Sequence, residues 1–276
     1  MKQGCVLAPV LFNLYFTQVL CHAVKDLKLG IYIRYRPDGS VFDLRRLAAK
    51  TKTSVKLILE ALFADDCALM AHDENHLQTI VNHFAKASKM FGLTISLGKT
   101  EVLVQAANTD RPQPKITIDG EQLKCVENFR YLGSTISADG SLDKEIESRI
   151  SKASQALGRL RVKVLLQKGI RLYTKLKIYK AVVIPSLLYG CETWTLYRRH
   201  IKQLEQFHMR SLINIMGIRW QDKTNNQEVL DRANLISIES LLLKAQLRWA
   251  GYVIWMADHR IPRQLMYGEV HEGSRK

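Results

Sequence analysis

The sequence predicts an α+β chain, with a first half that mixes helices and strands and a second half that is all helical. Short apolar runs alternate with turn residues through the first half, which is typical of strands joined by tight turns. From residue 144 onward, apolar residues recur at helical spacing instead. The polar turn Ala138–Ser141 separates the two patterns, so we expect one domain over residues 1–140 and another over 141–276.

The first half contains two predicted helices and several predicted strands. A helix is expected over about residues 10–25, followed by a strand over 31–35. Asp73 can cap a second helix that reaches about Phe91, because apolar residues follow it three and four positions apart. Further short strands are expected at residues 94–97, 101–104, 116–118, 122–126 and 129–131.

Basic residues are concentrated in the second half. Residues 144–276 carry 24 Lys and Arg against 11 Asp and Glu, whereas residues 1–143 carry 17 against 15. Ten basic residues lie between Arg149 and Lys180, and no acidic residue accompanies them. This asymmetry indicates a polyanionic partner, which on charge alone is a nucleic acid or an anionic membrane surface. The helices expected in this half cover residues 144–166, 171–183, 200–216, 226–233 and 238–254.

Composition indicates a globular intracellular protein. No apolar run approaches the roughly 20 residues that a membrane helix needs, and the N-terminus does not resemble a signal peptide. We therefore expect a nuclear or cytoplasmic location and no membrane partner. His72 and His76 are four residues apart, but no third ligand accompanies them, so no zinc site is predicted. The cysteines are scattered without a CxxC pair and are expected to be reduced: Cys5, Cys21, Cys67, Cys125 and Cys191.

Two adjacent carboxylates, Asp65 and Asp66, lie between two short apolar runs. We expect these runs to form two buried strands, with a tight turn at Ala64-Asp65-Asp66. Two unit charges 4 Å apart repel by about 4 kcal/mol at an effective dielectric near 20, and a bound cation would relieve that repulsion. A solvated hairpin turn is the alternative reading of an isolated Asp-Asp pair.

Five segments, taken in order, resemble the reverse transcriptases of non-LTR (LINE-type) retrotransposons, from the second conserved palm motif through the thumb. They are Lys2–Phe12, Leu62–Asp66, Phe91–Thr100, Phe129–Ser134 and Leu188–Trp194. The resemblance implies an RNA-directed DNA polymerase. It also implies a partial palm over residues 1–140, built as an antiparallel sheet with packed helices, and a basic thumb or connection region over 141–276.

By this resemblance, Asp65 is the principal metal ligand and Asp66 a second or supporting one. Two Mg²⁺ ions in the complete enzyme would clamp the attacking and leaving oxygens of nucleotidyl transfer. Hard cations prefer carboxylate oxygens, which accounts for the residue type. Lys99 matches the lysine that the family brings near the leaving pyrophosphate, where an ammonium could act as general acid. A solvated turn lysine is the alternative for Lys99.

The resemblance also implies nucleotide and primer contacts. Gln3 and Gly4 match the loop that the family places against the templating base and incoming dNTP, although an ordinary turn before a helix would look similar. Phe63 is the aromatic residue that often precedes Ala-Asp-Asp in the family. The primer grip, the strand that holds the primer end, corresponds to residues that could equally be packing beneath the thumb: Phe129, Tyr131 and Gly133.

The basic helices fit a thumb that follows the phosphates of an RNA template and an RNA–DNA duplex. The residues expected to contact this backbone are Arg149, Lys152, Arg159 and Lys163. Tyr189, Trp194 and Trp220 are expected in the core rather than as platforms for stacked bases.

The resemblance begins late in the family's motif order. In the family, the fingers and a first palm motif with another metal-binding aspartate precede the Gln3-Gly4 motif, but only Met1 and Lys2 precede it here. We therefore expect a fragment that is inactive alone. Two alternatives are a nucleic-acid-binding module that uses the basic helices, and a longer reading frame that supplies the missing aspartate.

Overall fold

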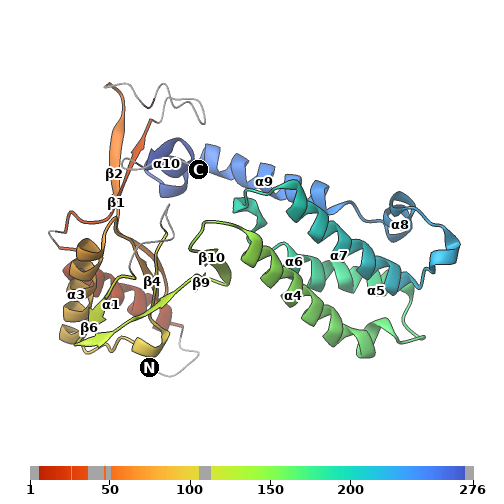
Figure 1. The fold of residues 1–276 in the computed structure, drawn as a ribbon, viewed down its shortest axis with the longest axis horizontal. Helices are drawn as coiled ribbons and strands as arrows, with labels where there is room; N and C mark the ends of the chain where they lie inside the picture. Colours follow the sequence, from red (N-terminus) through yellow and green to blue (C-terminus); the bar gives the residue numbers. More distant parts are fainter. Residues whose placement is uncertain (1–5, 26, 37–46, 48–50, 106–112, 271–276) are drawn as a thin grey trace. The chain divides into compact units, whose positions relative to one another are not determined.

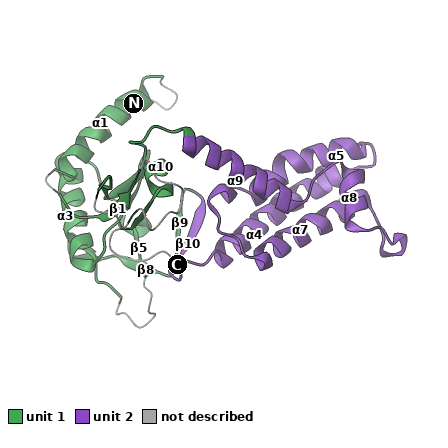
Figure 2. Cartoon of the chain, turned by 90° about the horizontal axis from the view of Figure 1, so that it is seen from above, with its two compact units in different colours: residues 1–132, 255–276 green, residues 133–254 purple. Residues whose placement is uncertain are grey.

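The computed structural model describes residues 6–25, 27–36, 47, 51–105 and 113–270, and these combine helices with small sheets as the α+β prediction expects (Figure 1). The chain divides into two compact units (Figure 2). Unit 1 comprises residues 1–132 and 255–276, and unit 2 comprises residues 133–254. No helix in the described ranges combines the length and apolar character needed to span a bilayer.

Two helices of unit 1 pack against each other. Helix α1 (Ala8–Ala23) starts with a proline in its first turn, and helix α3 (Glu74–Met90) is capped by Asp73, whose carboxylate accepts a 2.8 Å hydrogen bond from the His76 N–H. Both predicted helices are thus confirmed to within two residues. Their buried apolar side chains form one core together with Leu59, which lies outside both helices. The core residues are Val19, Ala23, Leu59, Ile80, Phe84 and Ala87.

The largest sheet of unit 1 pairs a strand near the C-terminus with strands from the first 60 residues. It is antiparallel in the order β11–β1–β2, with β1 over Ile31–Tyr35, β2 over Ser54–Ile58 and β11 over Gly268–Val270. Arg34 and Glu269 form a 2.7 Å salt bridge across the β1–β11 pair. Residues 255–276 therefore belong to unit 1, whereas the sequence placed them with the helical region. A three-residue strand is too short to show an alternating pattern, so this pairing could not be predicted from the sequence.

The other described strands of unit 1 pair locally. The family resemblance implied one antiparallel sheet, but β3–β4, β6–β7 and β5–β8 are separate pairs, the last of them parallel. The predicted strand over residues 94–97 is wrong: the N–H groups of Lys99 and Thr100 bond back to the Ser96 carbonyl, which closes a 3₁₀ turn instead of a strand ladder. The strands are β3 (Glu60–Phe63), β4 (Asp66–Leu69), β5 (Glu101–Leu103), β6 (Thr117–Ile118), β7 (Glu121–Gln122), β8 (Lys124–Val126) and β9 (Asn128–Tyr131).

Unit 2 is a helical unit that begins with one short strand, β10 (Ser134–Ser137). Its helices enclose a single apolar core, which includes the buried indole of Trp194. The predicted continuous helices around residues 161 and 179 contain π-helical stretches, Arg161–Leu165 and Tyr179–Val183. The helices are α4 (Asp143–Leu160), α5 (Leu172–Ile178), α6 (Ile184–Leu187), α7 (Arg198–Met216), α8 (Asn226–Ala233) and α9 (Ile238–Trp255); α10 (Ile261–Met266) follows in unit 1.

Candidate active site and nucleic-acid interface

The two adjacent carboxylates lie at the tip of the β3–β4 hairpin. Phe63 and Asp66 are the last paired residues, so Ala64 and Asp65 make a two-residue turn. Ala64 has a φ of +53°, a conformation that favours glycine at the first position of such hairpin turns. The turn therefore holds the carboxylates in place at some cost in backbone strain. This confirms the predicted strand–turn–strand arrangement.

The hairpin is more exposed than predicted. Phe63 is 63% exposed, and Asp65 and Asp66 are both exposed, whereas the sequence suggested two buried strands. The apolar runs that flank the turn are short, and their ends near the turn face solvent. Exposed carboxylate oxygens at a fixed turn can bind a hard cation such as Mg²⁺ without first breaking a hydrogen-bond network.

The described residues do not complete a metal cluster around these carboxylates. Within the described ranges, no group of three or more His, Cys, Asp or Glu side chains is placed to hold a metal ion. Glu60 belongs to the same hairpin, but it pairs with Leu69 at the end away from the turn. Burial raises the pKa of Glu60, which favours its protonated form over a metal-binding carboxylate. At the tip of this hairpin the carboxylates are those of Asp65 and Asp66.

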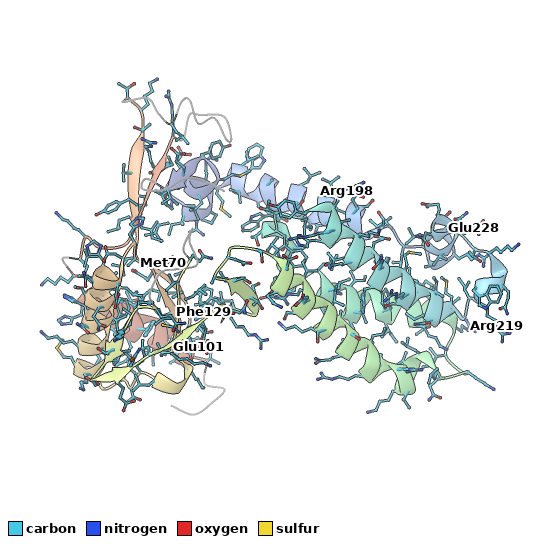
Figure 3. All side chains as sticks on the ribbon, in the orientation of Figure 1. Met70, Glu101, Phe129, Arg198, Arg219 and Glu228 are labelled. Atoms are coloured by element: carbon cyan, nitrogen blue, oxygen red, sulfur yellow. The ribbon has the colours of Figure 1, made fainter. Side chains whose placement is uncertain are left out.

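Tyr131 on β9 contacts the carboxylate hairpin directly. Its hydroxyl donates a 2.9 Å hydrogen bond to the carbonyl of Ala61 on β3, and its ring stacks with that of Phe129 at 6.4 Å between centroids. Burial raises the pKa of the Tyr131 phenol, and nearby Cys67 and Asp66 add to the shift. The phenol thus remains a hydrogen-bond donor. The structure brings Tyr131, with Phe129 beside it, to the hairpin that carries Asp65 and Asp66. Figure 3 labels Phe129.

Gly133, the third residue of the predicted primer grip, lies at the start of unit 2 and is held by two basic side chains. Its carbonyl accepts hydrogen bonds from Arg149 at 2.5 Å and from Lys152 at 3.0 Å. Arg149 is only 4% exposed, forms a 2.7 Å salt bridge with Glu145, and lies over the ring of Tyr189 at 4.7 Å.

Arg149 is therefore not a surface group that can reach nucleic-acid phosphates, so its predicted contact with the nucleic-acid backbone is wrong. The physical reason is its partner one helical turn earlier: Glu145 would be left as a buried, unpaired charge if Arg149 turned outward. A Glu–Arg pair spaced i, i+4 was the signal in the sequence that could have revealed this role.

The other predicted phosphate contacts are more accessible. Lys152 is half-buried and bonded to Gly133, whereas Arg159 and Lys163 are exposed. Lys99 is exposed in the 3₁₀ turn that precedes β5. Gln3 and Gly4 lie outside the described residues. The predicted roles of all these residues stay predictions.

The three aromatic residues expected in the core differ from one another. Trp194 is buried, which confirms the expectation. Tyr189 is 52% exposed and covers the guanidinium of Arg149. Trp220 is 85% exposed on the turn between α7 and α8, so its predicted core position is wrong. An indole gives no sign in the sequence of whether its turn points inward or outward.

Comparison with known proteins shows which family this chain resembles. Residues 1–136 match the family model described as reverse transcriptase (RNA-dependent DNA polymerase). A transposon-derived protein of Caenorhabditis elegans is 27% identical over 211 residues, which cover 72% of each chain. The RNA-directed DNA polymerases from mobile element jockey of Drosophila funebris and Drosophila melanogaster are 24% and 21% identical over 75% of this chain.

The chain spans about a quarter of the length of those two polymerases, with 24% of each covered. No solved structure matches it. The family match coincides with the segment that carries the carboxylate hairpin and β9, and the named relatives come from mobile elements. Residues 1–136 therefore belong to the reverse transcriptase family, and the chain is related to the reverse transcriptases of non-LTR retrotransposons.

Proposed function

We propose that this chain is part of an RNA-directed DNA polymerase in which Asp65 and Asp66 hold Mg²⁺ against the reacting phosphates. One observation carries the proposal: an exposed carboxylate pair is held on a strained two-residue turn within a reverse transcriptase domain. Carboxylate oxygens are the ligands that Mg²⁺ prefers, and enzymes of this family generally use that ion. When bound, the metal would polarise the α-phosphate and stabilise charge on the attacking and leaving oxygens.

The chain's own residues take the remaining roles in this proposal. Tyr131 and Phe129 support the primer end beside the carboxylate hairpin, since Tyr131 is hydrogen-bonded to that hairpin. Lys99 donates a proton to the leaving pyrophosphate, because its amine is exposed in the turn that precedes β5. Phe63, with Gln3 and Gly4, contacts the incoming nucleotide and the template.

Each unit has its own task in this proposal. Unit 1 acts as the palm that holds the reacting groups. Unit 2 acts as the thumb, because its exposed basic residues suit the phosphates of an RNA–DNA duplex. Residues 149–180 contain ten basic residues and no acidic one, and we call them the acid-free run. This run carries accessible cations, among them Arg159 and Lys163. Such contacts hold the duplex without reading its sequence.

We also propose that this chain alone does not synthesise DNA. In-line transfer between two metal ions needs ligands that bridge both ions, and two carboxylates on one turn do not provide that arrangement. A further carboxylate from another element would complete the site. Primer extension by the chain alone, on an RNA template with Mg²⁺, should give no product, and robust synthesis would refute this part of the proposal.

A chimera tests the polymerase role itself. The segment of the jockey polymerase that aligns with this chain would be replaced by residues 1–276, and primer extension on an RNA template would be measured. We expect synthesis by the chimera and its loss, by at least about 100-fold, on Asp65→Asn, because the metal loses its charged ligand.

Asp119→Asn is the matched control for this experiment. Asp119 also lies on a tight hairpin turn of unit 1 with a positive φ, and its only described ion pair is with the exposed Lys89. Activity should survive that change. If Asp65→Asn and Asp119→Asn chimeras are equally active, the proposed metal site is wrong.

A second candidate function is nucleic-acid binding without catalysis, supported by the long acid-free basic run of unit 2. Primer extension by the chimera separates the two functions. A binding module without catalysis would bind an RNA–DNA duplex with the same affinity in Asp65→Asn, but its chimera would give no primer extension even with Asp65 unchanged.

A further inference from the structure

Trp220 is an exposed indole on a well-defined turn. The turn joins α7 to α8, and Asp222 closes it: its carboxylate accepts a 2.8 Å hydrogen bond from the Arg219 N–H, while its own N–H bonds to the Arg219 carbonyl at 3.0 Å. Gly217, which ends α7, and Lys223, which ends the turn, both have a left-handed backbone conformation. These bonds hold the indole outward instead of letting it fold onto the core.

The turn that carries Trp220 lies at the same end of unit 2 as the segment that follows α4. Helices α4 and α7 start side by side, because Asp143 at the start of α4 accepts hydrogen bonds from Arg199 at 2.7 Å and from His200 at 2.9 Å at the start of α7. They pack together and run in the same direction, so both end toward the same end of unit 2. We call residues 159–171 and 217–225 the basic end of unit 2 (Figures 1 and 2).

The basic end has a one-sided charge. It contains a single acidic residue, Asp222, whose carboxylate is already used within the turn. In Figure 3, Arg219 marks this end of the unit, and Glu228 belongs to the next helix, α8. Seven exposed basic side chains belong to the basic end: Arg159, Arg161, Lys163, Lys168, Arg171, Arg219 and Lys223.

Helix ends explain only part of this arrangement. Cations near the C-termini of α4 and α7 complement the helix dipoles, which accounts for some of the basic residues. The dipoles give no reason for an indole with 85% of its surface in water. An exposed aromatic ring with a cation on either side of it in the same turn is, however, the combination that unpaired nucleotides bind: the ring stacks on a base and the cations contact the phosphates.

We infer that the basic end of unit 2 is a binding site for single-stranded nucleic acid, with Trp220 stacked on an unpaired base. A duplex fits the site less well, because the faces of its bases are covered by their neighbours in the stack. Arg219 and Lys223 flank the indole and would contact the phosphates on either side of the stacked base. The inference does not rest on polymerase activity, since neither metal nor dNTP takes part in it.

Fluorescence anisotropy of the full chain tests the inference. The probes are a labelled single-stranded oligonucleotide of about 15 nucleotides, within the range that single-strand sites cover, and an RNA–DNA duplex of the same length. We expect Trp220→Ala to weaken single-strand binding about 10-fold, the size of one lost base–aromatic stack, and to leave duplex binding unchanged. The exposure of Trp220 makes the variant unlike a core mutation, and circular dichroism would verify its fold.

Trp255→Ala is the matched control. Trp255 is 90% exposed but lies outside the basic end, so this change should leave both affinities unaltered. In a salt titration, an Arg219→Gln/Lys223→Gln variant should lower the slope of log Kd against log salt by about 1.4, whereas Trp220→Ala should keep the slope. Single-strand affinity that is unchanged in Trp220→Ala, or reduced equally for the duplex or in Trp255→Ala, would overturn the inference.

Discussion

At the scale of single residues, two buried polar side chains meet in the core of unit 2. The hydroxyl of Tyr179 and Nδ1 of His208 lie 2.9 Å apart, and both side chains are buried. Burial lowers the pKa of His208 from 6.5 to about 4. The imidazole is therefore neutral in the folded protein at neutral pH, and its protonation should favour unfolding.

This shift predicts how stability depends on pH. Between pH 6.5 and about 4 the unfolded chain binds a proton at residue 208 that the folded chain does not, so the free energy of unfolding falls as the pH falls through this window. The loss should reach about 3 kcal/mol, at 1.36 kcal/mol per pKa unit. Above pH 6.5 the contribution of the neutral imidazole is fully present.

Urea unfolding at several pH values, followed by near-ultraviolet circular dichroism, measures this effect. His208→Gln should be less stable at neutral pH but should show a flatter pH dependence between pH 6.5 and 4. His259→Gln, at an exposed histidine, should keep the slope of the unchanged protein. Identical slopes in all three proteins would show that His208 does not titrate as described.

Residue-scale sequence reasoning located the carboxylate pair but not the environment of each basic side chain. Arg149 and Arg159 belong to the same acid-free run, yet the first is buried with Glu145 and the second is exposed. Trp194 and Trp220 differ in the same way. The direction of a side chain depends on which helix face or turn meets the core, and this tertiary information is not contained in local composition.

At the scale of elements, the buried Glu145–Arg149 pair fixes the start of α4 against the turn that contains Gly133. Glu145 accepts a 2.7 Å hydrogen bond from the Thr135 N–H, and Arg149 donates to the Gly133 carbonyl. The pair thus satisfies backbone groups on both sides of that turn. Removing one partner leaves a buried charge without its counterion, which is more costly than removing both.

Thermal and urea unfolding of paired variants test this role. Arg149→Met should cost about 3–5 kcal/mol, whereas Arg159→Met, on the exposed face of the same helix, should change stability by less than about 0.5 kcal/mol. The double variant Glu145→Gln/Arg149→Met should be more stable than Arg149→Met alone. A cost for Arg149→Met no larger than that for Arg159→Met would contradict the buried pair.

Helices were easier to predict from the sequence than strands. Asp73 caps α3, and the apolar spacing of α3, α4 and α7 is long enough to define a buried face. Several strands of unit 1 have only two or three residues, too few to show an alternating pattern. The stretch 94–97 has the right composition for a strand, but the carbonyl of Ser96 is used by a local turn.

At the scale of the whole molecule, the two units follow the change in period and charge that the sequence shows. The division falls between Leu132 and Gly133, and not at residue 140, because β10 starts the compact helical unit. The return of residues 255–276 to unit 1 depends on a strand pair more than 200 residues apart in sequence, Arg34 with Glu269 among its members. Such long-range pairing leaves no local pattern to read.

The central claim, that Asp65 and Asp66 bind a divalent cation, is tested most directly by Fe²⁺-mediated cleavage of the full chain. With added H₂O₂, Fe²⁺ bound in place of Mg²⁺ reduces the peroxide to hydroxide and a hydroxyl radical that cuts the backbone beside the site, and ascorbate returns the Fe³⁺ to Fe²⁺. We expect cuts within β3–β4, suppressed by excess Mg²⁺, lost in Asp65→Asn/Asp66→Asn and retained in Asp119→Asn. Absence of cleavage in this hairpin, or equal cleavage in the double variant, would contradict the account.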